Sequence, residues 1–121
     1  MRYTRVHTDE QGESRFAVVE SATVTRQAAE SDLVAHVSEA FDVRGAYFRE
    51  PVTEASPVPH NAPYPLLIVM LHGRCSIEIS SGETREFGPG DVVLVEDTTG
   101  KGHTTRRVGD EPRLTLMLPL A

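Results

Sequence analysis

The 121-residue sequence predicts an all-β protein, built as a barrel or as a double-sheet jelly roll. Short runs of apolar or alternating residues recur along the whole chain, as is typical of strands. Turn residues separate these runs about every 8–12 residues, the spacing of β-sandwiches and barrels. No segment shows a convincing helical period, and no internal repeat or low-complexity segment is present.

The strands expected from these patterns are Arg2–His7, Arg15–Thr25, Gly45–Val52, Leu66–Leu71, Arg74–Ser80, Thr84–Phe87, Val92–Val95, Thr104–Val108 and Arg113–Leu120. Leu66–Leu71 is apolar on both faces, which indicates a strand buried from both sides. Arg26–Asp32 fits either a helical turn or an irregular arm, and Leu33–Phe41 is either extended or a loop.

Prolines dominate Thr53–Pro65, which contains Pro57, Pro59, Pro63 and Pro65. Their fixed φ and missing N–H exclude a helix and a central strand over this segment. The sequence therefore predicts a stiff, extended segment that holds His60 in place.

Composition sets limits on the class of protein. Hydrophobic residues make up 39% and charged residues 25%, so we expect one soluble globular domain over residues 1–121. The single cysteine, Cys75, excludes an internal disulfide and a cysteine-based zinc site. A net charge of −6 without a basic stripe argues against nucleic acid as a partner. No run is apolar enough to cross a membrane, and the polar N-terminus lacks the pattern of a signal peptide, so we expect a cytoplasmic protein.

Gly82–His103 reads GETREFGPGDVVLVEDTTGKGH: a turn, a strand, a Gly-Pro-Gly corner, a buried strand and a polar loop that ends in a histidine. This order resembles the second motif of the cupin superfamily, in which a histidine follows a Gly-Asp corner by about a dozen residues. His103 stands in that position, after a loop somewhat longer than usual, and Arg107 stands where an asparagine is typical. The stretch GPGDVVLVEDTTGKGH is similar to that of small single-domain bacterial cupins, many of which have no assigned reaction.

The first cupin motif, G-x5-H-x-H-x3,4-E-x6-G, supplies two histidines and a glutamate as metal ligands. With the last glycine of the motif placed at Gly73, the first histidine falls on His60. The second histidine falls on Ala62 and the glutamate on Leu66, so two of the three ligands are replaced by apolar residues.

The resemblance implies a cupin-type double-stranded β-helix, or jelly-roll barrel, over about residues 45–120, preceded by N-terminal strands and an extended arm over residues 1–44. It also implies a homodimer. In such a fold His60 and His103 project into the mouth of the barrel, where they act as acid and base or bind a divalent metal (Fe, Ni, Mn or Zn).

The expected pocket residues besides the histidines are Tyr47, Arg49, Ala62, Leu66, Ile68 and Met70. For the strand at 45–52, alternation allows either Tyr47 and Arg49, or Phe48 and Glu50, to face the cavity, and the sequence does not choose between them.

Five further residues could have a functional role. His72 either faces inward or is exposed at a turn, and we expect the turn. Cys75 alternates with isoleucines and is interpreted as an inert apolar residue. Glu96 and Asp97 are interpreted as caps of the following loop. Lys101 lies in a stretch that superficially resembles a phosphate-binding loop, but Val95 and Gly102 stand where that motif needs a glycine and a Ser or Thr.

We therefore expect a cupin that binds a small organic molecule and, as an enzyme of isomerase, cyclase, dehydratase or lyase type, uses His60 and His103 for acid–base chemistry. One alternative is a divalent-metal-dependent cupin enzyme such as a dioxygenase. The other is a binding module that holds a small ligand without catalysis.

Overall fold

The computed structural model describes residues 1–27, 29, 31–53 and 56–121. These residues contain no α-helix, and their strands are β1 (Arg2–Thr8), β2 (Ser14–Glu20), β3 (Thr23–Gln27), β4 (Val34–Ser38), β5 (Tyr47–Arg49), β6 (Leu66–His72), β7 (Arg74–Glu78), β8 (Thr84–Phe87), β9 (Val92–Val95), β10 (Thr104–Val108) and β11 (Leu114–Pro119). Nowhere in these ranges is there a helix with the length and apolarity needed to cross a membrane.

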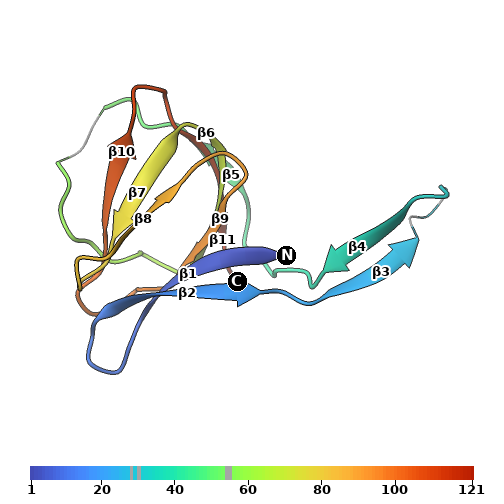
Figure 1. Ribbon diagram of the computed structural model, residues 1–121, viewed down its shortest axis with the longest axis horizontal. Coiled ribbons are helices and arrows are strands. Elements are labelled where there is room, and N and C mark those ends of the chain that lie inside the picture. The colour runs from blue at the N-terminus through green and yellow to red at the C-terminus, as the bar shows by residue number, and fades with distance from the viewer. Residues whose placement is uncertain (28, 30, 54–55) are drawn as a thin grey trace.

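Three sheets organise the described strands (Figure 1). The largest has six strands in the order β2-β1-β9-β6-β11-β5, and the second has three in the order β10-β7-β8. Neighbouring strands are antiparallel except for β1 and β9, which pair in parallel. The prediction of an all-β fold is confirmed. The described strands form a double sheet and not a closed barrel.

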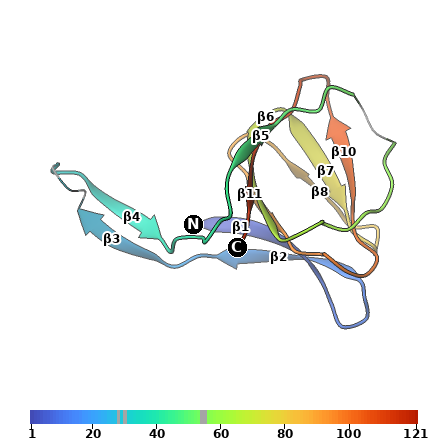
Figure 2. The same ribbon diagram turned by 180° about the vertical axis from the view of Figure 1, so that it is seen from behind.

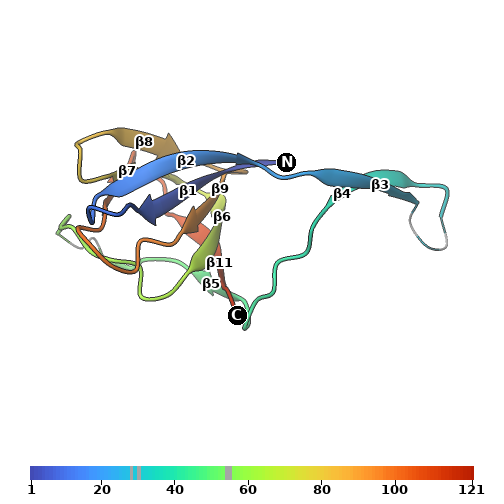
Figure 3. The same cartoon turned by 90° about the horizontal axis from the view of Figure 1, so that it is seen from below.

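The third sheet is the β3–β4 hairpin, which projects from the body beyond the ends of β1 and β2 (Figures 1 and 3). The prediction of one strand over Arg15–Thr25 is therefore wrong, because β2 stops at Glu20. Glu20 pairs with Arg2, the first residue of β1, and Ser21 with the terminal Met1, so the chain from Ala22 on extends past the end of β1. It pairs with β4 instead, which gives Leu33–Phe41 a strand in its middle. The turn or arm predicted for Arg26–Asp32 lies partly outside the described residues.

The core lies between the two large sheets, seen from opposite sides in Figures 1 and 2. Its buried apolar side chains come from both sheets: Val6, Leu66, Met70, Val93, Val95 and Met117 from one, and Cys75, Ile77 and Phe87 from the other. Removing such side chains from water is the main favourable contribution to folding. Their alternation along each strand also determines which residues face the space between the sheets.

Candidate functional site

A cavity of about 480 Å³ opens between the two large sheets, within the range of small-molecule sites. Its walls come from β5, β6, β7, β9, β10 and β11 and from the proline-rich segment after residue 56. The proline-rich segment thus forms one side of the cavity and brings His60 into it. Both histidines that the sequence analysis selected, His60 and His103, line this space.

His60 and His103 are joined through their backbones as an isolated antiparallel bridge. Each backbone N–H donates a hydrogen bond to the other residue's carbonyl oxygen, with N···O distances of 2.9 Å in both directions. The two imidazole rings lie side by side with their centroids 4.6 Å apart. Gly102 makes this approach feasible, because a Cβ atom there would lie 2.3 Å from the carbonyl oxygen of His60.

The side chain of His103 is oriented by Asp97. Nδ1 of His103 lies 2.5 Å from Oδ2 of Asp97, and the exposed fractions of the two residues are only 5% and 0%. An ionised carboxylate only accepts hydrogen bonds, so this contact places the imidazole proton on Nδ1 and leaves Nε2 as the free, basic nitrogen. The other carboxylate oxygen of Asp97, Oδ1, is buried and makes no hydrogen bond to any described residue.

His60 has a different setting. Its Nδ1 lies 3.2 Å from the carbonyl oxygen of Val58, which again directs the Nδ1 proton to an acceptor and leaves Nε2 free. The residue is exposed at the cavity, whereas His103 is buried. Asn61 fixes the chain beside it by donating to the carbonyl oxygens of Asp97 and Gly100, at 3.2 and 3.1 Å.

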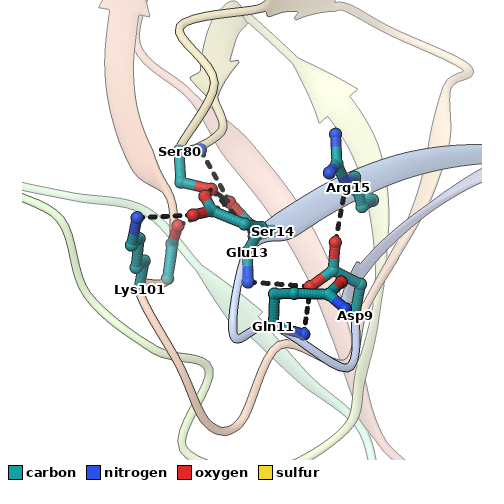
Figure 4. Close-up of polar contacts among 8 residues, drawn as sticks. Asp9, Gln11, Glu13, Ser14, Arg15, Ser80 and Lys101 are labelled. Carbon is teal, nitrogen blue, oxygen red and sulfur yellow. Dashed lines mark hydrogen bonds and ion pairs between the residues drawn. The ribbon is translucent and has the colours of Figure 1, made fainter.

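A polar cluster behind the site holds the loop between β9 and β10 (Figure 4). The buried Ser14 hydroxyl donates to the carbonyl oxygen of Gly102 at 2.8 Å, and Lys101 pairs with Glu13. Ser80, in the turn that follows β7, donates a hydrogen bond to the same carboxylate of Glu13. The turn between β1 and β2 is therefore connected directly to the residue that precedes His103. Lys101 is part of this support and not of a phosphate-binding loop.

Two tyrosines meet at the cavity wall. The hydroxyl oxygens of Tyr47 and Tyr64 are 3.3 Å apart, and the guanidinium of Arg44 lies over the Tyr64 ring. The hydrogen bond to Tyr64, helped by partial burial, raises the pKa of Tyr47 above its ordinary value. Tyr47 therefore stays protonated at neutral pH and presents a neutral hydroxyl to the cavity.

The structure shows which side chains of β5 face the cavity, a choice that the sequence left open. Tyr47 and Arg49 line the cavity, whereas Phe48 points to the opposite face, where 69% of it is exposed. β5 is held in this orientation by pairing with β11, where Tyr47 lies opposite Met117 and Arg49 opposite Thr115.

All of the pocket residues expected from the sequence line the cavity: Tyr47, Arg49, Ala62, Leu66, Ile68 and Met70. His72 does not: it lies exposed at the end of β6, and its Nδ1 is 3.3 Å from the carbonyl oxygen of Pro112. Cys75 lines the cavity while almost fully buried, and burial raises the pKa of its thiol.

Three residues of the site were missed by sequence reasoning. Asp97 was interpreted as a loop cap, which is wrong, because its side chain contacts the His103 ring. The spacing Asp-x5-His across a loop with two glycines was the available signal. Tyr64 and Arg113 gave no signal, because their places depend on the pairing of distant strands.

The donors present do not fit a tightly held divalent metal. Catalytic zinc sites usually take three protein ligands and structural ones four. Among the described residues no three His, Cys, Asp or Glu side chains converge. Leu66, at the position of the motif's glutamate, is buried in the apolar wall.

A smaller hollow of about 300 Å³ lies among β1, β8 and β9. Its charged residues are all engaged, and none of its described lining residues is a histidine. Arg2, Arg85 and Glu86 form ion pairs with Glu20, Glu83 and Arg74, and the Asp91 carboxylate accepts a hydrogen bond from the Gly88 backbone N–H. We therefore place the candidate site in the larger cavity.

Comparisons with known proteins add no family: the chain matches no protein-family model and no curated protein.

Proposed function

We propose that this chain is a small single-domain enzyme of the cupin type that moves protons on an organic molecule bound between its two sheets. The observation that carries the proposal is the buried contact between Asp97 and His103, beside the ring of His60. A carboxylate that fixes the tautomer of a histidine and leaves its second nitrogen toward a cavity is a common arrangement for a general base. The Gly-Pro-Gly corner between β8 and β9 and the position of His103 support the cupin assignment.

The chemical step follows from the free nitrogen of His103. Nε2 takes a proton from a carbon next to a carbonyl group, the C–H bond breaks, and its electron pair stays on the substrate as an enolate. Asp97 stabilises the imidazolium that forms, since their contact becomes an ion pair. Asp97 touches no substrate in this scheme and is a positioning residue.

His60 completes the transfer. In its protonated form it returns a proton to the enolate at a different atom, which gives an isomer of the substrate. Loss of a leaving group from the same enolate gives instead a dehydration or lyase reaction. Two adjacent imidazoles with different surroundings, one buried and one exposed, suit these opposite roles.

The walls of the cavity favour this chemistry. Leu66, Ile68 and Met70 from β6 and Val93 and Val95 from β9 provide an apolar surface that excludes water from the reacting carbon. Positioned acid–base catalysis contributes ~10²–10⁴-fold to a rate, and water exclusion strengthens the electrostatic contacts around the site.

Solvent-deuterium exchange tests the proposal without knowledge of the product. A panel of enolisable ketones and keto acids is incubated with the protein in D₂O, and deuterium next to the carbonyl is measured by NMR. We expect catalysed exchange in at least one compound, which is lost in His103→Gln. Compounds that bind without any exchange would contradict the proposal and favour the non-catalytic binding module.

A further inference from the structure

Among the described residues, the permanently charged side chains that line the cavity are all cationic. Two arginines, Arg49 and Arg113, face it, and no described aspartate or glutamate lines it. The protein as a whole carries 18 acidic and 12 basic side chains. A cationic cavity in an acidic protein is therefore a local feature that the overall composition does not explain.

The two cavity arginines also differ from most arginines in the described part of the chain. Arginines elsewhere in the described part of the chain mostly form ion pairs, namely Arg2, Arg5, Arg15, Arg74, Arg85, Arg106 and Arg107. Arg49 and Arg113 have no carboxylate partner among the described residues, although Arg113 is half-buried. A half-buried guanidinium without a counter-charge, as in Arg113, is unfavourable, so an anion in the cavity would stabilise it. Arg49 is exposed and would add a second charge-assisted contact to the same anion.

Cys75 does not supply that counter-charge. The Arg113 guanidinium lies beside its sulfur and favours the thiolate, but burial has the larger effect and raises the pKa of the thiol. Cys75 is therefore a neutral thiol at neutral pH. Arg113 keeps donors available for a ligand, because a guanidinium carries five N–H groups.

The backbone fixes Arg113 at this position. Gly73, in the turn between β6 and β7, packs so closely on it that a Cβ atom there would lie 2.5 Å from the carbonyl oxygen of Pro112. The register of β6 and β11 shifts between Leu114 and Thr115, and bulges of this kind reorient side chains next to binding sites. Across the sheet Arg49 lies opposite Thr115, so both arginines belong to the same end of the cavity.

His60 and His103 lie at the opposite end of the cavity from the two arginines. On β6, Leu66 lies opposite Val95 at the histidine end, and Met70 lies opposite Thr115 at the arginine end. Four residues of strand separate these two levels, which is about 13 Å at ~3.3 Å per residue. The apolar side chains of Ile68, Val93 and Met117 lie between them.

We propose that the cavity binds a small organic anion, with Arg113 and Arg49 holding its carboxylate or phosphate group and the apolar walls enclosing its hydrocarbon part. This inference rests on the proposed function, because it places the reacting carbon of the same ligand at His103. The substrate class is thus a carbonyl compound that carries an acidic group at the far end of an apolar segment.

Matched test compounds separate charge from shape. Hydrocinnamate is compared with its neutral amide, hydrocinnamide, and phenyl phosphate and inorganic phosphate identify which anionic group is preferred. Binding is measured by calorimetry at low and high salt. We expect hydrocinnamate or phenyl phosphate to bind about tenfold to a hundredfold more tightly than hydrocinnamide, since charge-assisted hydrogen bonds are stronger than neutral ones. Inorganic phosphate alone should bind weakly, because it has no apolar part.

Arg113→Gln should remove the preference for the anion, and Arg113→Lys should restore part of it. The matched control is Arg26→Gln, which removes the same charge from β3 and lies outside the cavity. Equal binding of hydrocinnamate and hydrocinnamide, an unchanged preference in Arg113→Gln, or no binding by any anion at millimolar concentration would overturn the inference. Anion binding without deuterium exchange in any compound would contradict the acid–base proposal alone, and exchange that is indifferent to Arg113 would contradict this inference alone.

Discussion

Nδ1 of His103 lies 2.5 Å from the Oδ2 atom of Asp97, inside the protein and next to the imidazole of His60. Five residues separate the two in the chain, and the loop between them turns through Gly100 and Gly102, both with positive φ. The pair therefore depends on the conformation of one loop, which is held by Thr8 of β1, Ser14 of β2 and Glu13 in the turn between these strands. Support of this kind suits a residue that must keep one orientation during a reaction.

Asp97→Asn should leave the fold intact but remove the charge that stabilises the His103 imidazolium. We expect deuterium exchange to fall by about 10²-fold or more. In nitrogen-detected NMR, wild-type His103 should show the proton on Nδ1, and the variant should show a mixture of tautomers. Glu96→Gln is the matched control, because Glu96 is the neighbouring carboxylate and pairs with Arg5 away from the ring. Equal tautomer populations in wild type and Asp97→Asn would rule out the positioning role.

Gly102→Ala should destabilise the protein, because the added methyl group would clash with the backbone of His60. A Cβ atom at Gly102 would meet the backbone of His60, at φ +73. Gly109→Ala is the control, since Gly109 has φ +78 but no atom within 4 Å of the added Cβ. We expect Gly109→Ala to cost about 1–2 kcal/mol in the free energy of unfolding and Gly102→Ala about 3 kcal/mol or more. Urea denaturation measures both, and similar losses would contradict the close approach described here.

The Glu13–Lys101 pair predicts how stability depends on pH. The hydrogen bond from Lys101 lowers the pKa of Glu13 below its ordinary value of 4.5, and a hydrogen bond from Ser80 acts in the same direction. A lowered folded-state pKa stabilises the protein above the unfolded pKa and ceases to do so as the pH falls through the folded value. Glu13→Gln should therefore be less stable than wild type at about pH 7, and the difference should shrink toward about pH 3. Urea denaturation at both values checks this. A difference independent of pH would show that the pair contributes nothing through ionisation.

The sequence predicted some of the fold closely, and the reasons are local. Thr84–Phe87, Val92–Val95 and Thr104–Val108 are strands with the predicted ends, because Gly-containing turns or a loop bound each of them. The division of Arg15–Thr25 into two strands was not predictable, because it depends on where the distant strand β1 begins. Which side chains of β5 face the cavity was also not predictable, because the pairing of β5 with β11 determines it.

Only part of the candidate site could likewise be predicted from the sequence. His60, His103 and the β6 wall could be placed from motif spacing and strand alternation. Asp97 could not be preferred over its capping interpretation, because loop conformation decides where its carboxylate points. Arg113 could not be found, because its place at the cavity depends on the pairing of β11 with the distant strand β6.

The homodimer remains a prediction, and the β3–β4 hairpin is where we expect the second copy to pack. An isolated two-stranded hairpin is only marginally stable in water, so this one needs cover. Its cross-strand pair Val24 and Val37 is exposed on one face. Light scattering at micromolar concentration should show a dimer, and Val24→Lys should shift it toward the monomer. Val52→Lys should not, because Val52 is 92% exposed and lies outside the hairpin. A wild-type monomer would contradict this prediction.

Metal content distinguishes the proposed chemistry from the metal-dependent alternative. Because two imidazoles offer fewer donors than the usual three, we expect well below one equivalent of Fe, Ni, Mn or Zn per chain after purification without added metal. Plasma mass spectrometry measures this. One equivalent of any of them, lost together in His60→Gln and His103→Gln, would favour a metal-dependent cupin enzyme.

The most direct test of the central proposal compares deuterium exchange among three histidine variants on the same compound. His103→Gln should abolish catalysed exchange, because its Nε2 takes the proton. His60→Gln should keep exchange but abolish isomer formation in the same NMR spectra, because His60 returns a proton at the second atom. His72→Gln should match wild type, since His72 lies exposed at the end of β6 and does not line the cavity. Undiminished exchange in His103→Gln, with the fold intact, would contradict the proposal that this histidine is the base.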